Sequence, residues 1–232
     1  MKTTIFGLEN IPLGKKNILD ERLKKLEEMF TSKKVTFLQI EFILIENIKD
    51  AEVVISGKEK KSDLILSDLE YVEDRLTKEI SPQEKELFSK AKEILEKEEF
   101  LSKQLNPEEL KILKGFPLIT VLPVYLIREE ADLNKAEVLQ EIYYLSGRIC
   151  FFTAGEKEAR AWSIHNGNTA LEAAGCIHSD IQKGFIRAEV VSVHDLLEIG
   201  NYNQVKNEGK VRLENKEYIV KDGDYIIFRF NK

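Results

Sequence analysis

The 232-residue sequence predicts a fold of α/β plus α+β class: an α/β layer, a helical hairpin inserted into it, and a small strand-rich domain after them. Three observations support this prediction. In the first 61 residues, short β-branched and aromatic runs alternate with a helical pattern, which is typical of parallel α/β structure. Between about 62 and 114, charged residues at helical spacing dominate. After residue 148, short strand patterns are separated by turn residues.

The α/β layer is expected to contain short strands and two helices. Strand patterns lie at 3–7, 35–45, 51–55 and 118–127. Pro123 indicates that the last of them begins or bulges at that point. Asp20 is placed to cap a helix. The apolar residues of that helix share one face at spacings of three and four, and they are Leu23, Leu26, Met29 and Phe30. A second amphipathic helix is expected over 134–147.

The inserted arm is predicted from two helix-start signals. Ser81-Pro-Gln-Glu84 and Asn106-Pro-Glu-Glu109 each combine a cap residue, a proline at the first helical position and a glutamate at the third. The cap oxygen and the glutamate satisfy backbone amides that the first turn leaves free. We therefore expect helices near 63–79, 82–103 and 107–114. The seam of the hairpin is expected to consist of Leu87, Phe88, Ala91, Ile94 and Leu95.

From residue 148 onward the pattern predicts a ubiquitin-like β-grasp with Trp162 at least partly buried. Asn168-Thr169 can cap a short helix, and Asp195 is a natural cap for another that ends at Gly200. The dipeptides Asn215-Lys216 and Asp222-Gly223 supply turns. The expected strands lie at 149–153, 159–164 and 185–193, with closing strands between 209 and 230.

Two stretches of this part carry a specific resemblance: Phe152-Thr-Ala-Gly-Glu-Lys-Glu-Ala-Arg-Ala-Trp162 and Ala173-Ala-Gly-Cys-Ile-His-Ser-Asp-Ile-Gln-Lys-Gly-Phe-Ile-Arg-Ala-Glu189. They resemble the C-terminal TGS-type domain of the YchF subfamily of Obg-like P-loop nucleotidases. Residues 62–76 and 105–120 are similar to the start and the return of that family's coiled-coil insertion. The resemblance implies a reduced P-loop-like domain at 1–61 and 115–147, a helical arm at 62–114, and a TGS-like β-grasp domain at 148–232.

The phosphate-binding loop departs from that family. A working P-loop needs Gly-x4-Gly-Lys-Ser/Thr, because its amides wrap the phosphates and its hydroxyl holds Mg²⁺. Gly7, Gly14 and Lys15 lie in the matching region and are interpreted as a vestigial nucleotide site. The two glycines are seven residues apart, Pro12 removes an amide donor, and Lys16 stands at the hydroxyl position.

The other nucleotide elements depart as well. Relative to the family pattern, Leu44 stands at the metal-side aspartate and Asn47 at its glycine, while Arg128-Glu129 replaces the base-recognising asparagine. Asn134 is interpreted as a helix cap with Glu137. We therefore expect no enzyme, with no catalytic residue, no metal, no cofactor, no nucleotide binding and no hydrolysis.

The histidines and cysteines show no metal-ligand spacing. Cys150 and Cys176 lie in apolar segments without a CxxC spacing and are predicted to be reduced core thiols. His178-Ser-Asp180 resembles an element that recurs in TGS domains of RNA-associated proteins. The alternative is that His178 only supports a turn.

Basic and aromatic residues gather in the C-terminal part and indicate a binding face for RNA or the ribosome. The candidates are Lys157, Arg160, His178, Lys183 and Arg187, with Arg229, Trp162 and Phe185 nearby in sequence. Strand alternation predicts that Arg160 shares a side with Trp162, and that Phe185 shares a side with Arg187. The alternative is that the rings are core and the cations a solvated rim.

The resemblance implies a non-catalytic protein that associates with RNA, the ribosome or another macromolecule through the TGS-like domain and the arm. Two alternatives stay open: a residual ATP- or GTP-binding protein with weak or no hydrolysis, and a module that binds only proteins. The net charge of −6 argues against a surface that binds nucleic acid everywhere. The absence of a long apolar run predicts no membrane span, and the short apolar start predicts no signal peptide, so we expect a cytoplasmic location.

Overall fold

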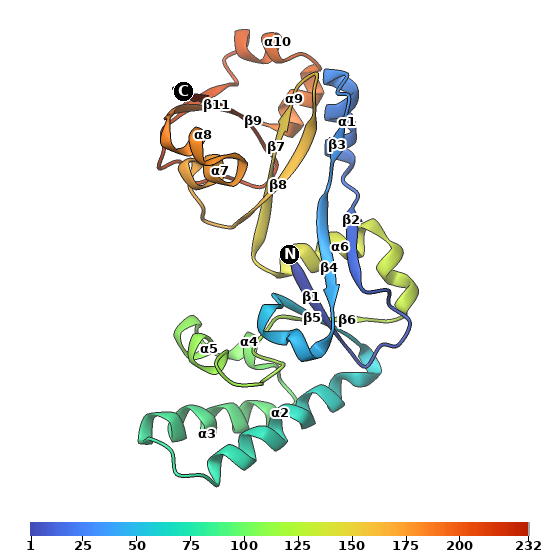
Figure 1. Ribbon diagram of the computed structural model, residues 1–232, viewed down its shortest axis with the longest axis vertical. Helices are drawn as coiled ribbons and strands as arrows, with labels where there is room; N and C mark the ends of the chain where they lie inside the picture. Colours follow the sequence, from blue (N-terminus) through green and yellow to red (C-terminus); the bar gives the residue numbers. More distant parts are fainter. Residues whose placement is uncertain (232) are drawn as a thin grey trace. The chain divides into compact units, whose positions relative to one another are not determined.

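The computed structural model describes residues 1–231 and has a mixed α/β fold with two sheets, as the sequence predicts (Figure 1). The chain divides into two compact units, each of which is built from two segments. Unit 1 comprises Met1–Lys16 and Gln39–Ser146, and unit 2 comprises Asn17–Leu38 and the residues from Gly147 onward. Among residues 1–231, no helix combines the length and the apolar character that a membrane crossing requires.

The sheet of unit 1 has the strand order β2-β4-β1-β5-β6. Its strands are β1 (Lys2–Phe6), β2 (Gly14–Ile18), β4 (Leu38–Ile43), β5 (Val53–Gly57) and β6 (Val124–Ile127). β1 pairs in parallel with both β4 and β5, and β5 pairs in parallel with β6. The carboxyl ends of three adjacent strands, β1, β5 and β6, therefore lie at one edge of the sheet.

Three expectations for the α/β layer need correction. The strand expected at 35–45 is split, because β3 (Val35–Thr36) joins the sheet of unit 2 and β4 joins that of unit 1. Residues 118–122 are buried but form no strand, and β6 begins directly after Pro123, as predicted for this proline. Asn134 does not cap a helix: α6 (Ala136–Leu145) begins two residues later, and the side-chain oxygen of Asn134 accepts a hydrogen bond from Lys16 Nζ at 2.7 Å.

Short 3-10 turns connect the strands. They are η1 (Ile45–Asp50), η2 (Lys58–Lys60) and η3 (Glu130–Asn134). In η3 the side chains of Glu129 and Asp132 accept hydrogen bonds from each other's backbone amides. The turn is therefore capped by these two residues and is separate from α6.

The arm consists of α2 (Lys61–Leu76), α3 (Pro82–Glu96), α4 (Leu101–Gln104) and α5 (Pro107–Leu113). Both predicted caps are confirmed: the Ser81 side chain accepts from the Glu84 amide, and Asn106 forms a capping box with Glu109. α3 is shorter than predicted, because Glu98 adopts a left-handed conformation (φ 57°) that ends it. The predicted seam is confirmed for its buried members, which are Leu87, Phe88, Ala91 and Leu95.

A buried carboxylate on α2 holds the chain where it returns from the arm. Asp68 is fully buried, and its oxygens accept hydrogen bonds from the amides of Ile119 and Thr120 and from Thr120 Oγ1, each at 2.7 Å. Burial raises the pKa of Asp68, while these hydrogen bonds oppose the shift. Residues 118–122 have no strand partner, so Asp68 satisfies backbone donors that would otherwise be buried alone.

We predict that Asp68→Ala lowers the free energy of unfolding by about 2–4 kcal/mol, because it leaves these buried donors without a partner. Asp68→Asn keeps one acceptor oxygen and should cost less. Urea unfolding followed by circular dichroism measures both. The control is Asp63→Ala, which removes only an exposed ion pair with Lys60 and should change stability by less than about 0.5 kcal/mol. Equal stabilities of the Asp68→Ala variant and the parent would contradict the prediction.

The sheet of unit 2 has the order β10-β9-β11-β7-β8-β3. Its further strands are β7 (Arg148–Ala154), β8 (Ala159–His165), β9 (Phe185–Ser192), β10 (Arg212–Glu214) and β11 (Asp224–Phe230). One face packs on α1 (Glu21–Phe30), α9 (Val193–Ile199) and α10 (Tyr202–Asn207). The other face packs on α7 (Ala170–Ile177), which is followed by α8 (Ser179–Lys183).

Most strands of this part lie where the sequence places them, but some local predictions were wrong. α8 and α10 were not expected, and α9 is capped by Ser192 instead of Asp195. Thr169 caps α7 as predicted, with Glu172 as its capping-box partner. Trp162 is half-buried, as predicted. Cys150 is a buried thiol and burial raises its pKa, whereas Cys176 is exposed because the buried face of α7 consists of Ala170, Ala173 and Ala174.

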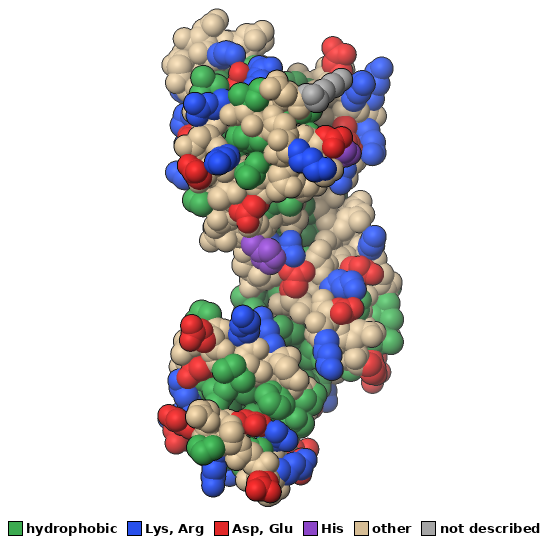
Figure 2. Space-filling view, turned by 60° about the vertical axis from the view of Figure 1, so that its left-hand side comes forward, with side chains coloured by type: hydrophobic (Ala, Val, Ile, Leu, Met, Phe, Trp, Pro, Cys, Tyr) green, Lys and Arg blue, Asp and Glu red, His purple; other side chains and the backbone are tan. Residues whose placement is uncertain are grey.

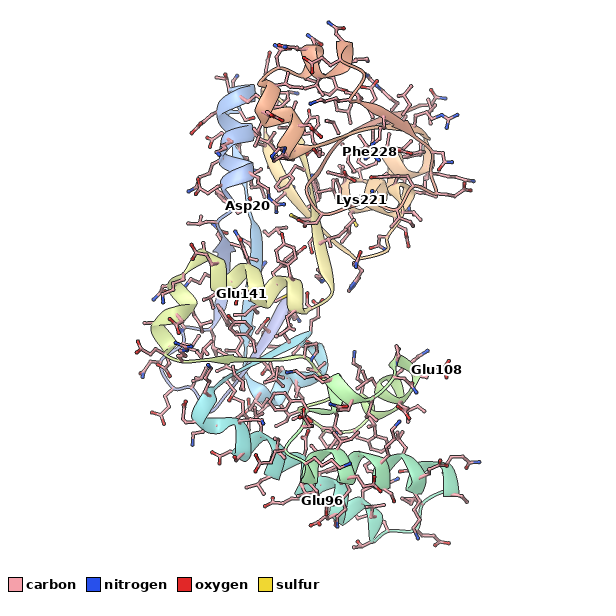
Figure 3. All side chains as sticks on the ribbon, turned by 180° about the vertical axis from the view of Figure 1, so that it is seen from behind. Asp20, Glu96, Glu108, Glu141, Lys221 and Phe228 are labelled. Atoms are coloured by element: carbon pink, nitrogen blue, oxygen red, sulfur yellow. The ribbon has the colours of Figure 1, made fainter. Side chains whose placement is uncertain are left out.

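Residues 17–38 group with the C-terminal part of the chain, although the domain division drawn from the sequence places them at 1–61. Asp20 begins α1, where it accepts from the amide of Arg22, as predicted (Figure 3). Leu23 and Leu26 are fully buried in one cluster with Phe152 of β7. The division into three domains stays a prediction.

Candidate functional site

A pocket of about 290 Å³ lies at the carboxyl ends of β1, β5 and β6. Ligands of open α/β sheets bind at such strand ends, next to the strand where the connections change direction. β1 is that strand, because its parallel neighbours β4 and β5 lie on opposite sides of it. The pocket is lined by Gly7, Leu8, Glu9, Asn10, Gly57, Glu59, Ile127, Arg128 and Glu130. Its position is the one that a nucleotide takes in a P-loop protein.

The residues of this pocket do not fit a triphosphate with its metal ion. Three carboxylates line it, from Glu9, Glu59 and Glu130, against the single guanidinium of Arg128. The amide of Glu9, in the loop after β1, donates to Glu130 Oε1 at 3.0 Å and so is already occupied by an anion. Phosphate cradles instead present free amide donors and a lysine.

The residues interpreted as a vestigial site are separated. Gly7 lines the pocket in a left-handed conformation (φ 67°), and an added Cβ there would meet the Lys60 side chain at 3.0 Å. Gly14 and Lys15 lie in β2, a strand, and not in a loop before a helix. Leu44 is half exposed and precedes η1, which contains Asn47.

In unit 2, a groove of about 770 Å³ runs beside α8 and the end of β11. It is lined by His178, Asp180, Ile181, Lys183, Gly184, Phe230 and Asn231. His178 caps α8, because its Nδ1 accepts from the Asp180 amide at 3.1 Å. The local role expected for His178 as the alternative therefore exists in the structure. Lys183 and His178, both predicted binding residues, are brought together here beside the ring of Phe230.

Arg160 and Trp162 lie on one side of β8, as alternation predicts. Arg160 Cζ lies 3.9 Å from the centroid of the Trp162 ring, and Trp162 Nε1 donates to Thr153 Oγ1 at 2.9 Å. Phe151, Phe228 and Phe185 continue the row of rings across β7, β11 and β9 with centroid distances of 6.1–6.3 Å. The row ends beside Gly184 in the groove.

Arg187 does not join this row. A register irregularity in β11 between Arg229 and Phe230 pairs Phe185 with Phe230 and Arg187 with Arg229. Phe185 packs in the cluster under α7, whereas Arg229 bonds Glu189, which also accepts from Tyr202 of α10 at 2.5 Å. The expectation that Phe185 and Arg187 share a side was wrong because of this irregularity.

The predicted cations therefore form several separate groups. Lys157 is exposed in the turn between β7 and β8. Arg229 was expected near the binding face because it lies close to it in sequence. In the structure its guanidinium forms an ion pair with the buried carboxylate of Glu189 at 3.0 Å. Figure 2 shows hydrophobic side chains at the surface of the body drawn at the top, with Lys and Arg side chains around them.

The sequence reasoning missed one group of metal-ligand type. Ligand atoms of His194, Asp195 and Glu198 lie within 4.8 Å of one another on α9. The i, i+4 spacing of His194 and Glu198 was the available signal. Asp195 already bonds Ser192 Oγ and lies 3.5 Å from Lys210 Nζ, so an internal cation and a hydroxyl satisfy it.

Comparison with known proteins defines the class. Residues 149–231 match the YchF-GTPase C-terminal family, described as a protein of unknown function (DUF933). A Bacillus subtilis protein named ribosome-binding ATPase YchF is 31% identical over 325 aligned residues, which cover 94% of this chain and 89% of that protein. That alignment is longer than the chain, so it contains gaps in this sequence. The Haemophilus influenzae protein of the same name is 50% identical over 103 residues, 44% of this chain and 28% of that protein.

The structure of the Schizosaccharomyces pombe YchF GTPase has the same fold, with a TM-score of 0.74 at 19% identity, covering 99% of this chain and 97% of that one. The class of the chain is therefore that of the Obg-like P-loop NTPases. Within that class, the chain belongs to the YchF subfamily.

These findings overturn one expectation. The prediction of a protein that is not an enzyme is contradicted, and the expectation that the chain binds no nucleotide finds no support. The relatives are named ATPases and the structural neighbour a GTPase, which points to a nucleotide-hydrolysing family.

Glu189 gives a testable pH dependence. Burial pushes its pKa up, but hydrogen bonds from Tyr202, Arg229 and Lys206 outweigh burial, so the pKa lies below its ordinary value. The resulting stabilisation is complete above about pH 4.3, the pKa of an unfolded glutamate, and is lost as the pH falls through the folded pKa. We predict that Glu189→Gln unfolds more easily at pH 7 and shows a flatter loss of stability below pH 4.3.

Thermal unfolding between pH 3 and 7 tests this prediction. The matched control is Glu217→Gln, an exposed glutamate of the same unit. Identical pH profiles of the parent and the Glu189→Gln variant would show that this carboxylate does not act as described.

Proposed function

We propose that this chain associates with the ribosome and that unit 2 contacts RNA there. The observation that carries the proposal is the groove beside α8, where Lys183 and His178 flank the exposed ring of Phe230. Cations beside aromatic surface are the combination that single-stranded RNA segments use, because phosphates need positive charge and unstacked bases need a flat apolar partner. The names of the relatives support ribosome association, and a cytoplasmic location follows from it.

The arrangement of the chain fits this proposal in three parts. Residues 148–232 act as a TGS-like β-grasp domain that carries the RNA contact. Residues 62–114 act as a helical arm with many exposed charges that offers a second surface. Residues 1–61 and 115–147 form a reduced nucleotidase-like domain with a degenerate P-loop. We derive no step through a nucleotide, because the carboxylates of the strand-end pocket do not form a phosphate cradle.

The charges and the size of the groove limit the kind of RNA that it can bind. Asp180 lies in it and is 71% exposed, so the groove is not uniformly cationic. A single unstacked base with its flanking phosphates fits a groove of about 770 Å³ better than a duplex does, because a duplex presents its phosphates to a broad basic face. The exposed Arg187 of the adjoining strand β9 lies on the other side of that strand from Phe185 and does not line the groove, so it offers a phosphate contact beyond the groove.

We predict that Lys183→Glu with Arg187→Glu weakens binding to ribosomes and to RNA and reduces the salt dependence, since a protein that neutralises fewer phosphates releases fewer counterions. Co-sedimentation with ribosomes at two salt concentrations measures the first effect, and gel-shift titration with RNA the second. The slope of log K against log salt should fall by about 0.7–0.9 for each phosphate that the variant no longer neutralises.

The matched control is Lys216→Glu with Lys221→Glu, which reverses two exposed charges in the segment between β10 and β11, neither of which lines the groove. Lys90→Glu with Lys97→Glu tests the arm, and weaker binding of that variant would indicate that the arm also contacts the RNA backbone. A Lys183/Arg187 variant that binds as well as the parent would contradict the proposed groove. No co-sedimentation of the parent protein would contradict the function itself.

A further inference from the structure

We infer that unit 2 has a second RNA contact, formed by the stacked pair Arg160–Trp162 together with Lys33, Lys34 and Lys157, and that it takes an unpaired nucleotide. This inference rests on the proposed function. The base would stack on the guanidinium of Arg160, and the flanking phosphates would face the lysines.

The Arg160–Trp162 pair is held in place by residues of the neighbouring strand β7. The Trp162 ring is fixed by the hydrogen bond to Thr153 and lies nearly parallel to Phe151, with an interplanar angle of 13°. Arg160 Cζ lies 3.9 Å from the centroid of the Trp162 ring, so the guanidinium covers this half-buried ring. Bases stack on guanidinium planes as they do on aromatic rings. The guanidinium and the ring are therefore in contact before any ligand arrives.

Arg160 has donors to offer. Within residues 1–231 it forms no salt bridge and is partly exposed; its Nε lacks a hydrogen-bond partner but is buried, so the donors that a ligand can reach are those of its terminal NH2 groups. Glu158 already accepts from Thr36 Oγ1 at 2.5 Å and pairs with Lys34 Nζ at 3.0 Å, and its pKa is lowered chiefly by the Thr36 bond, with a smaller effect of the Arg160 charge. An arginine that is stacked but not ion-paired is suited to recognise a phosphate or a base edge.

The lysines come from a part of the chain that is remote in sequence. β3 pairs in parallel with β8, with Val35 opposite Ala159 and Thr36 opposite Arg160. Just before β3, the Lys33 amide donates to the Glu156 carbonyl at 3.0 Å, and the Ala159 amide donates to the Lys34 carbonyl at 2.9 Å. These bonds place Lys33 and Lys34 beside the turn that carries Lys157.

The charge of this surface favours an anion. Four cations, of Lys33, Lys34, Lys157 and Arg160, stand against the carboxylates of Glu156 and Glu158. Lys34 is 67% exposed although it pairs with Glu158, so its ammonium group stays accessible. The combination of a stacking plane with a cationic border fits single-stranded RNA better than an acidic protein, which would use the charge but not the plane.

The composition of the chain provides a direct test, because Trp162 is its only tryptophan. The intrinsic fluorescence of the intact chain therefore reports the occupancy of this surface. Titration with single-stranded oligouridine should change the Trp162 emission in step with binding measured by gel shift. Binding that leaves the emission unchanged would overturn the inference.

Two variants separate the stack from the charge. Arg160→Lys keeps the charge but loses the plane, and it should weaken oligouridine binding about tenfold. Lys33→Glu with Lys34→Glu should weaken binding and lower the salt slope by about 1.4, for two phosphate contacts on a single strand. Lys216→Glu with Lys221→Glu is again the control and should bind like the parent. Circular dichroism confirms that each variant is folded.

The outcomes also separate this inference from the proposed function. If Arg160→Lys binds like the parent, or if the parent co-sediments with ribosomes but binds no oligouridine, the second contact is wrong while ribosome association stands. If the parent does not co-sediment at all, the proposed function fails. An acidic protein partner would show itself as sensitivity to Lys33→Glu with Lys34→Glu but not to Arg160→Lys, which also overturns the inference.

Discussion

The C-terminal unit depends on the contacts that one side chain, the guanidinium of Arg22, makes with its neighbours. It donates to both oxygens of Asp20, at 2.8–3.2 Å, and to Asp222 Oδ2 at 2.9 Å, and it lies 5.1 Å from the centroid of the Phe152 ring. Asp222 in turn accepts from the amide of Cys150. One side chain near the N-terminus thus joins α1 to β7 and to the turn before β11. Because Arg22 pairs with Asp20 and Asp222, it avoids the desolvation penalty that an unpaired, half-buried arginine would carry.

The apolar packing around this network supplies the larger stabilisation. Leu23 and Leu26 are fully buried against the sheet, and each such leucine contributes about 1.5–3 kcal/mol. Phe30 stacks on Tyr225 of β11 with a centroid distance of 5.5 Å. Because α1 is anchored, the residues after it reach the sheet edge as β3 and carry Lys33 and Lys34 to the strand of Arg160.

The strand-end pocket combines a common position with an acidic lining. Its position follows from parallel pairing around β1, which any open α/β sheet would share. Its lining depends on the loop after β1, which turns at Gly7 and offers its Glu9 amide to Glu130. The parallel layer is thus present, while three of the side chains at its edge are carboxylates. The comparisons nevertheless place the chain in a nucleotide-hydrolysing family.

Local chemistry in the sequence determined much of the fold. The caps at Asp20, Ser81, Asn106 and Thr169, the entry at Pro123, and the strands of 148–165 need only neighbouring residues, because helix ends and turns are satisfied within a few positions.

The sequence also determined which residue types could bind RNA, but not which of them meet. Only the tertiary structure separated Arg187 from Arg160, through a strand irregularity, and placed Asn134 beside Lys16 instead of at a helix start. Only it moved residues 17–38 into the C-terminal unit. The physical reason is that strand pairing and buried ion pairs join residues more than a hundred positions apart, and no local pattern records such a partner.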